Sequence, residues 1–159
     1  MTLRRMRPGD HGELLRLWRG FPGNAVTGAD EPAGFVSFLE RNGDLCFVLE
    51  DGGTVRGSVM ASHDGRRGYV YHLAVEAGLQ GRGFGRALMD RVEAALAAAG
   101  IEKAHLFIFS DNPAVRFYEK AGWHLRRDIE VMSKTLGKTA GAAEPATDGD
   151  DPLVRGETR

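Results

Sequence analysis

The 159-residue chain holds 42% apolar and 27% charged residues at a formal net charge of −1, which suits one soluble domain. This balance gives no reason to expect nucleic acid or an anionic membrane as a partner. The single cysteine, Cys46, excludes an intrachain disulfide framework and fits a reducing compartment. With no charged-then-apolar leader and no apolar run of about 18 residues, we expect a cytoplasmic protein without a membrane span.

The first half of the chain predicts two helices among four strands. Leu14, Leu15 and Trp18 form the apolar stripe of the first helix, which we expect Asp10 to cap. Short glycine turns later join three apolar runs, and these predict an antiparallel meander. The expected elements are a strand over 2–7, helices over 11–20 and 31–42, and strands over 44–51, 54–64 and 69–76.

The second half predicts a strand–helix–strand unit and a hairpin. A helix with apolar residues at intervals of three and four follows the stretch LQGRGFGRAL and ends at Gly100. The apolar run over 104–110 is then expected to lie parallel to the strand over 69–76, because a crossover helix joins them. Asn112-Pro113 begins a short helix that ends at Gly122. Residues 123–136 supply final strand material, predicted as a hairpin broken near Arg127.

These elements predict one mixed α+β domain over residues 1–136, with a mostly antiparallel sheet and one parallel strand pair. Residues 137–159 contain no aromatic residue and only two large aliphatic ones, Leu153 and Val154. Such a segment cannot bury enough apolar surface to offset its ordering entropy, so we expect a disordered C-terminal tail. A peptide that docks through those two residues is the alternative.

Three glycines, Gly81, Gly83 and Gly85, alternate directly ahead of the predicted helix. Unpaired N–H groups at a helix start, with no Cβ atoms in the way, favour a phosphate. Arg82 and Arg86 add possible charge-assisted contacts to phosphate oxygens; a turn that simply needs glycine is the alternative. A Rossmann loop needs glycine where Arg86 stands, and a Walker A loop needs Gly-Lys-Ser/Thr, so both fit poorly.

The stretch from Gln80 to Gly85 resembles the Q/R-x-x-G-x-G/A pattern of the GNAT family of N-acetyltransferases. The resemblance extends to HLAVE upstream and to DNPAVRFYEKAGW downstream, and covers roughly residues 2–136. The run SHDGRRGYVYHLAV is similar to the small bacterial YpeA-type subgroup. Ala77 is a departure, because relatives often carry proline there. The resemblance implies helices on both faces of the sheet and a parallel strand pair that splays apart.

The resemblance also implies acetyl-CoA as the cosubstrate. Backbone N–H groups of residues 81–86 would hold the pyrophosphate, and the strand edge around Ala74 would pair with the pantetheine arm. Asn112 would contact the same arm, or serve only as a helix cap. The implied cofactor-binding residues are Leu73, Ala74, Val75, Gln80, Gly81, Arg82, Gly83, Phe84, Gly85, Arg86 and Asn112.

Acetyl transfer to an amine needs a neutral amine, a donor for the oxyanion and a proton for the leaving thiolate. Tyr118 stands where the family places its acid tyrosine; the alternative is packing beside Phe117. Glu76 is the expected base, because many relatives use a carboxylate on this strand; a solvated glutamate or a chain of waters is the alternative. His72 is expected to be a packed strand residue, with Tyr71 alternating to the other face of the sheet.

Cys46 is expected to be inert core, so we expect direct transfer within a ternary complex, without an acetyl-cysteine. The five histidines show no zinc-ligand spacing, so no metal is expected. The predicted function is an acetyl-CoA-dependent N-acetyltransferase whose acceptor is a primary amine of a small molecule, an amino acid or a protein. A homodimer is common among relatives. The alternatives are a non-catalytic acyl-CoA-binding sensor or interaction module, and a different nucleotide binder.

Overall fold

The computed structural model describes residues 1–21 and 26–136. Backbone contacts divide the chain into two compact units, Met1–Ile108 and Phe109–Arg159. The tail predicted at 137–159 lies outside the described residues.

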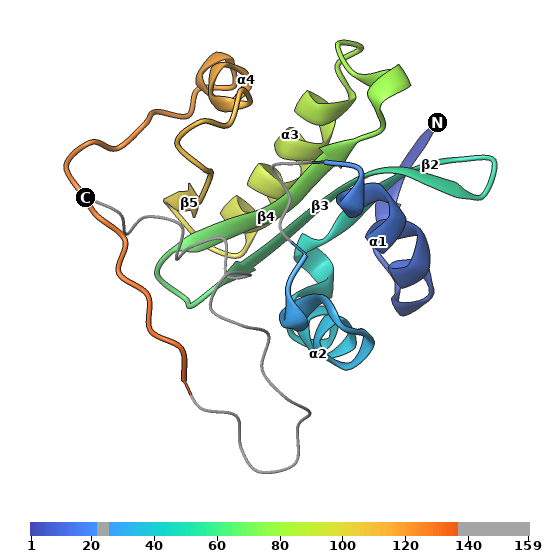
Figure 1. Ribbon diagram of the computed structural model, residues 1–159, viewed down its shortest axis with the longest axis horizontal. Coiled ribbons are helices and arrows are strands. Elements are labelled where there is room, and N and C mark those ends of the chain that lie inside the picture. Colours follow the sequence, from blue (N-terminus) through green and yellow to red (C-terminus); the bar gives the residue numbers. More distant parts are fainter. Residues whose placement is uncertain (22–25, 137–159) are drawn as a thin grey trace. The chain divides into compact units, whose positions relative to one another are not determined.

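The first unit is built on a five-stranded sheet whose strands follow one another in chain order (Figure 1). The first three pairings are antiparallel and the last, between β4 and β5, is parallel, so the predicted mixed fold is confirmed. The strands are β1 (Thr2–Arg5), β2 (Phe47–Asp51), β3 (Thr54–His63), β4 (Gly68–Val75) and β5 (Ala104–Leu106).

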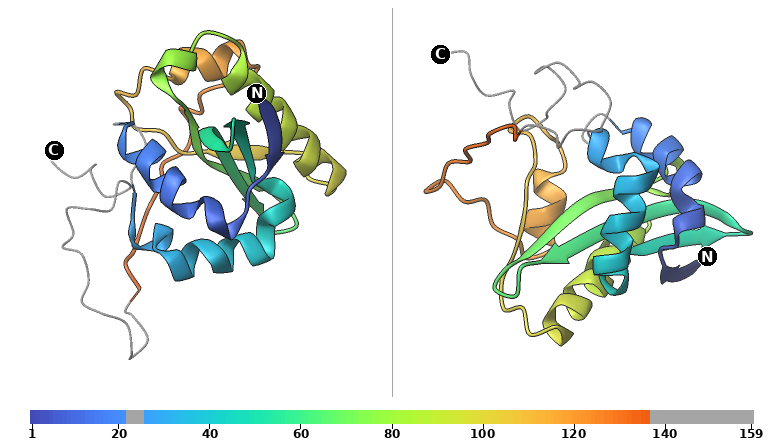
Figure 2. Two further views of the ribbon diagram at one scale, coloured as in Figure 1. Left: turned by 90° about the vertical axis from the view of Figure 1, so that its right-hand side faces the viewer. Right: turned by 90° about the horizontal axis from the view of Figure 1, so that it is seen from below.

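Helices cover both faces of this sheet. Figure 2 shows α1 (His11–Arg19) and α2 (Pro32–Asn42) on one face and α3 (Phe84–Ala98) on the other. Four short 3₁₀ turns complete the unit, namely η1 (Pro8–Asp10), η2 (Gly28–Asp30), η3 (Gly43–Leu45) and η4 (Ala77–Leu79). Within the described residues, no helix is both long and apolar enough to cross a membrane.

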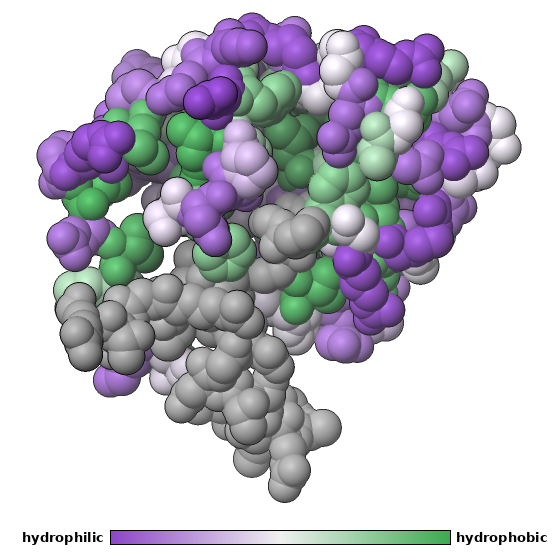
Figure 3. All heavy atoms as spheres, turned by 45° about the horizontal axis from the view of Figure 1, so that its top comes forward, coloured by the Kyte–Doolittle hydropathy of each residue, from purple (hydrophilic) through white to green (hydrophobic). Residues whose placement is uncertain are grey.

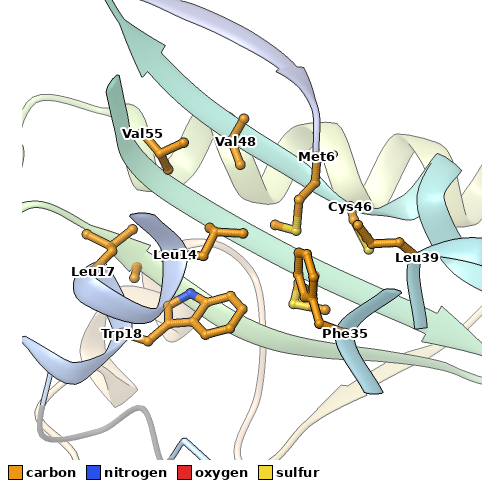
Figure 4. Packing of buried hydrophobic residues seen from close by; sticks show 11 residues of the cluster. Met6, Leu14, Leu17, Trp18, Phe35, Leu39, Cys46, Val48 and Val55 are labelled. Carbon is orange, nitrogen blue, oxygen red and sulfur yellow. The ribbon is translucent and has the colours of Figure 1, made fainter. Parts of the chain in front are cut away.

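The core between the two N-terminal helices and the sheet is apolar and closely packed. Figure 4 shows Leu14 and Trp18 from α1 and Phe35 from α2 directed at the strands. Each of these side chains is at most 1% exposed, and full burial of one such side chain contributes about 1.5–3 kcal/mol. On the opposite face, α3 buries the stripe that the sequence predicted, including Leu88 and Val92. Figure 3 shows hydrophilic side chains interspersed with hydrophobic ones over the face that it draws.

Asp10 does not cap α1, which corrects one prediction. Its carboxylate makes no capping bond to α1 and instead accepts the backbone N–H of Arg7 at 2.8 Å, which closes η1. The same carboxylate accepts two hydrogen bonds from the guanidinium of Arg4, both 2.8 Å long. An arginine in reach offers a stronger, charge-assisted partner than the N–H groups of the helix.

The second unit contains the helix α4 (Val115–Lys120). Asn112 Oδ1 accepts the backbone N–H of Ala114 at 2.9 Å, but the helix begins at Val115 with Ala114 as its N-cap, so the cap predicted at Asn112 lies in the turn before the helix. Gly122 has a φ of +91°, the left-handed conformation expected where the helix ends.

The final hairpin predicted over 123–136 is wrong, because these residues form no strand. Arg126 pairs with Asp128 only two positions further on, and the side chains of Met132 and Leu136 are 96% and 80% exposed. The segment therefore buries little apolar surface, and a two-stranded hairpin without a covered face is marginal in water.

Candidate functional site

The parallel pairing of β4 with β5 is short. It joins only Gly68, Tyr69 and Val70 to their partners, although β4 continues to Val75 (Figure 1). Within Met1–Ile108, the edge of β4 from residue 71 to residue 75 therefore has no partner strand on this side. Unpaired backbone groups on an edge are free to bond an extended ligand in the manner of an added strand.

A β-bulge interrupts β4 at the start of this free edge. Ser58 pairs with Ala74 and Met60 with Tyr71, so two residues of β4 face a single residue of β3. His72 lies in the bulge with a φ of +49°, the only non-glycine residue of the described chain with a positive value. Strained backbone conformations of this kind in non-glycine residues occur most often at functional sites.

The bulge corrects the predicted direction of Tyr71. Its ring meets Phe38 of α2 edge-on at 5.9 Å, while the ring of His72 stacks on Trp18 of α1 at 4.0 Å. Both side chains thus point to the face that α1 and α2 cover. The extra residue breaks the alternation that assigned Tyr71 to the opposite face.

The glycine-rich stretch forms the turn into α3. Gly81 and Gly83 have φ values of +72° and +85°, and no atom lies within 4 Å of the position that a Cβ would occupy. Gly85 lies within the first turn of α3, where the N–H groups have no acceptor inside the helix. This loop presents open backbone at the positive end of a helix dipole and is chemically suited to an anion.

Side chains of the loop make specific local contacts. Gln80 Nε2 donates to the carbonyl of Val75 at 3.0 Å and ties the loop to the end of β4. The guanidinium of Arg82 lies 5.7 Å from the ring centre of Phe84. Arg86 pairs with Asp90 at 2.6 Å on the exposed surface of α3. Ala77 starts η4, so the chain turns here without a proline.

Glu76 follows β4 and is held by two arginines. Its carboxylate lies 2.8 Å from Arg56 Nη1 and 3.7 Å from Arg16 Nη1. A proton added to Glu76 would weaken both ion pairs, and this bears on its predicted role as the base.

Asp30, which the sequence did not predict as a site residue, lies against the bulge. Its Oδ1 is 2.8 Å from His72 Nε2, and its Oδ2 accepts the backbone N–H of Thr27 at 2.8 Å. Burial alone would raise the pKa of Asp30, but the hydrogen bond and charge of His72 and the bonds from Thr27 lower it below its ordinary value. The two residues are 42 positions apart, so no local sequence pattern predicts their contact.

Tyr118 lies on α4 in the second unit. Its ring contacts those of Phe117 and Trp123 edge-on, at 5.2 and 6.4 Å. Burial raises the pKa of Tyr118 to about 12, so the phenol keeps its proton at neutral pH.

A hollow of about 570 Å³ is lined by the C-terminal ends of α2 and α3, with Arg5 and His63. None of the predicted site residues lines it. The buried thiol of Cys46 donates to the carbonyl of Asn42 at 3.3 Å, and burial raises its pKa to about 11. A thiol that stays protonated is a poor nucleophile, in agreement with the inert role predicted for Cys46.

Comparison with known proteins gives the same family from several directions. The model of the acetyltransferase (GNAT) family matches residues 12–123. Acetyltransferase SG1711 from Sodalis glossinidius is 34% identical over 141 residues, which cover 86% of this chain and 96% of that protein.

Solved structures share the fold. Ard1 from Thermoplasma volcanium gives a TM-score of 0.70 at 22% identity, over 79% of this chain and 83% of the other. Rv2747 from Mycobacterium tuberculosis, solved in complex with CoA, gives a TM-score of 0.62 at 18% identity, over 77% and 70%. With a family model that matches well over half of its residues, the chain belongs to the acetyltransferase (GNAT) family.

Proposed function

We propose that the protein is an acetyl-CoA-dependent N-acetyltransferase that acetylates a primary amine of a small molecule, an amino acid or a protein. One observation carries the proposal: the open glycine turn at the start of α3 follows the unpaired edge of β4, with only Glu76, η4 and Gln80 between them. Coenzyme A has an anionic diphosphate and an extended, amide-bearing pantetheine arm, and these two features match the two parts of the site. The CoA held by Rv2747, which has the same fold, supports the choice of ligand.

The backbone of residues 81–86 would bind the diphosphate, and the edge at Leu73, Ala74 and Val75 would pair with the amides of the arm. Gln80 keeps the loop and the strand end together through its bond to the carbonyl of Val75. Asn112 stays a prediction as a further contact of the arm, beside its bond to Ala114.

The proposed chemistry is direct transfer in a ternary complex. The neutral amine attacks the thioester carbonyl, the C–N bond forms, and the C–S bond breaks to release CoA as its thiolate. We assign Tyr118 as the group that meets this thiolate. Its pKa of about 12 makes it a donor at every working pH, whereas a free thiol has a pKa of about 8.5. The phenol therefore stabilises the departing sulfur by a hydrogen bond before any proton moves.

The reaction also needs a base to remove a proton from the acceptor. A free lysine amine has a pKa of about 10.4, so an acceptor of this kind arrives as an ammonium ion and must lose a proton. Glu76 stays a prediction for this task, and its ion pairs with Arg56 and Arg16 make it a weak candidate.

The test is an acceptor screen that measures free thiol released from acetyl-CoA. Wild type should release CoA with at least one class of amine, and Tyr118→Phe should lose about 100-fold in turnover while it binds acetyl-CoA as wild type does. Tyr69→Phe, which also removes a phenol, is the matched control and should keep its turnover.

Two results would contradict the proposal. Tight acetyl-CoA binding without thiol release for any amine would favour the non-catalytic sensor. Native turnover in Tyr118→Phe would remove the assigned acid.

A further inference from the structure

Asp30 and His72 form an almost enclosed polar pair beneath the N-terminal helices. Asp30 Oδ1 and His72 Nε2 are 2.8 Å apart, and the two side chains are only 10% and 13% exposed. Thr27 holds the other carboxylate oxygen with its backbone N–H at 2.8 Å and with its hydroxyl at 3.3 Å. The carboxylate is thereby fixed by its own 3₁₀ turn before it meets the imidazole.

Two further contacts fix the histidine. Its ring lies parallel to the indole of Trp18, 4.0 Å away and tilted by 13°. Ser58 donates its hydroxyl to the carbonyl of His72 at 2.8 Å and accepts the indole N–H of Trp18 at 2.9 Å. A positive φ costs a non-glycine residue about 1–2 kcal/mol, which glycine at this bulge would avoid. The imidazole of His72 therefore occupies a position where the backbone conformation favours glycine.

The carboxylate decides which ring nitrogen carries the hydrogen. An ionised carboxylate only accepts hydrogen bonds, so Nε2 of His72 must be the donor to Asp30. In the neutral ring, Nδ1 then keeps its lone pair, and no described residue bonds to it. The ring stands just past Val70, where β4 leaves β5 and its free edge begins.

We propose that His72 is the general base of the acetyl transfer, with Nδ1 as the accepting atom, and that Asp30 is its positioning residue. This inference rests on the proposed function. Nδ1 takes one proton from the acceptor ammonium and leaves a neutral amine and an imidazolium. The amine nitrogen then bonds to the thioester carbon, and the C–S bond breaks.

The protons balance over one turnover. The nitrogen of the new C–N bond loses its surplus proton to the departing thiolate, so that CoA leaves as the free thiol. The imidazolium of His72 passes its proton to water. The negative charge of Asp30 stabilises that imidazolium, and its hydrogen bond keeps the ring from turning.

The pair is better suited to this step than Glu76. Both oxygens of Glu76 face guanidinium groups, whereas Nδ1 of His72 has no partner among the described residues. Trp18, which stacks on the ring, and Ser58, which bonds the carbonyl of His72, carry no group that titrates near neutral pH. His11 is a titratable neighbour of the pair, and its Nε2 lies 2.8 Å from the backbone carbonyl of Asp30.

The experiment follows thiol release against pH with the best acceptor of the screen. At about pH 7, His72→Gln should lose about 100-fold or more in kcat/KM, with acetyl-CoA binding unchanged. The deficit should shrink as the pH approaches the amine's own pKa of about 10.4, because a growing fraction of the amine is then neutral without help. His63→Gln, which changes an exposed histidine, is the control and should follow the wild-type profile.

A second variant separates the base from a structural role. His72→Gly suits the positive φ and leaves a ring-sized gap beside Trp18, so imidazole added to the solution should restore part of its rate. Asp30→Asn should lose less activity than His72→Gln, because it leaves the base in place but poorly oriented.

The outcomes distinguish this inference from the proposed function. A deficit that stays constant with pH in His72→Gln, with no imidazole rescue of His72→Gly, would overturn the base and leave the acetyltransferase intact. Native rates in His72→Gln at every pH would also overturn the base and leave the acetyltransferase intact. A wild type that binds acetyl-CoA but acetylates no amine would overturn both.

Discussion

Arg4 joins the first strand to the turn before the first helix through a two-pronged contact. Its Nη1 and Nη2 each lie 2.8 Å from an oxygen of Asp10, and both side chains are largely buried. Burial alone would raise the pKa of Asp10, but the hydrogen bonds from Arg4 and from the backbone of Arg7, with their charges, lower it. The contact therefore links the stability of the fold to pH.

The direction of this link follows from the lowered pKa. Asp10 stabilises the fold fully above its unfolded pKa of about 3.9, and the contribution is lost as the pH falls through the lower pKa of the folded state. Asp30 acts in the same direction. We predict that the free energy of unfolding, measured by urea denaturation, decreases below about pH 4.

Asp10→Asn tests this contribution. It should destabilise the fold at neutral pH by about 1–3 kcal/mol and remove part of the loss at acid pH. Asp44→Asn breaks an exposed ion pair with Arg5 and should stay within about 0.5 kcal/mol of wild type. An unchanged acid dependence in Asp10→Asn would show that this contact does not carry it.

Features of single residues that depend on a local pattern could be predicted from the sequence, whereas contacts between distant residues could not. The glycine turn was predictable because Gly81 and Gly83 stand in a short local pattern, and both adopt the left-handed conformation. The pair of Asp30 with His72 was not, because it depends on a bulge and on a turn 42 positions away. Glu76 was predicted as the base from the resemblance to relatives with a carboxylate on this strand, and this resemblance gave no sign of Arg56, which lies beside it.

At the scale of elements, Gly34 lets α2 lie close against η2. A Cβ at this position would lie 2.4 Å from the backbone carbonyl oxygen of Ala29, nearer than any real contact allows. Because η2 also carries Asp30, the packing of these two elements sets where the carboxylate reaches the bulge of β4.

We predict that Gly34→Ala destabilises the protein by about 1–3 kcal/mol, since the two elements must move apart. Gly12→Ala is the matched helical control, as no atom lies within 4 Å of its added Cβ, and it should stabilise by up to about 1 kcal/mol. Thermal unfolding of both variants measures the difference. Equal midpoints would mean that α2 and η2 tolerate the added methyl.

Elements with strong periodicity were predictable and those that depend on distant partners were not. The predicted helix over 31–42 is observed as α2, and the meander of β2, β3 and β4 is observed as such. The strand predicted over 104–110 ends at Leu106, and the segment from 123 to 136 stays without strand structure. In both cases the apolar pattern is present, but no hydrogen-bonded partner strand accompanies it in the described chain.

For the whole molecule, the proposed acetyltransferase function depends on the backbone of residues 81–86 as the binding site of acetyl-CoA. The acetyl transfer proposed for this GNAT-family fold requires this site, whatever its acceptor, base and acid. Two glycines with nearly the same backbone conformation, one inside this site and one outside it, allow the site to be tested separately from backbone strain. Gly83 and Gly53 have φ values of +85° and +83°, and no atom lies within 4 Å of an added Cβ at either position.

The most direct measurement is calorimetric titration of acetyl-CoA into wild type, Gly83→Ala and Gly53→Ala. Both substitutions strain the backbone by about 1–2 kcal/mol, but only Gly83 lies in the loop before α3, while Gly53 lies in the exposed turn between β2 and β3. We predict binding heat for wild type and for Gly53→Ala, and affinity weakened by about tenfold or more in Gly83→Ala. No heat with wild type, or equal affinity in the two variants, would contradict the account.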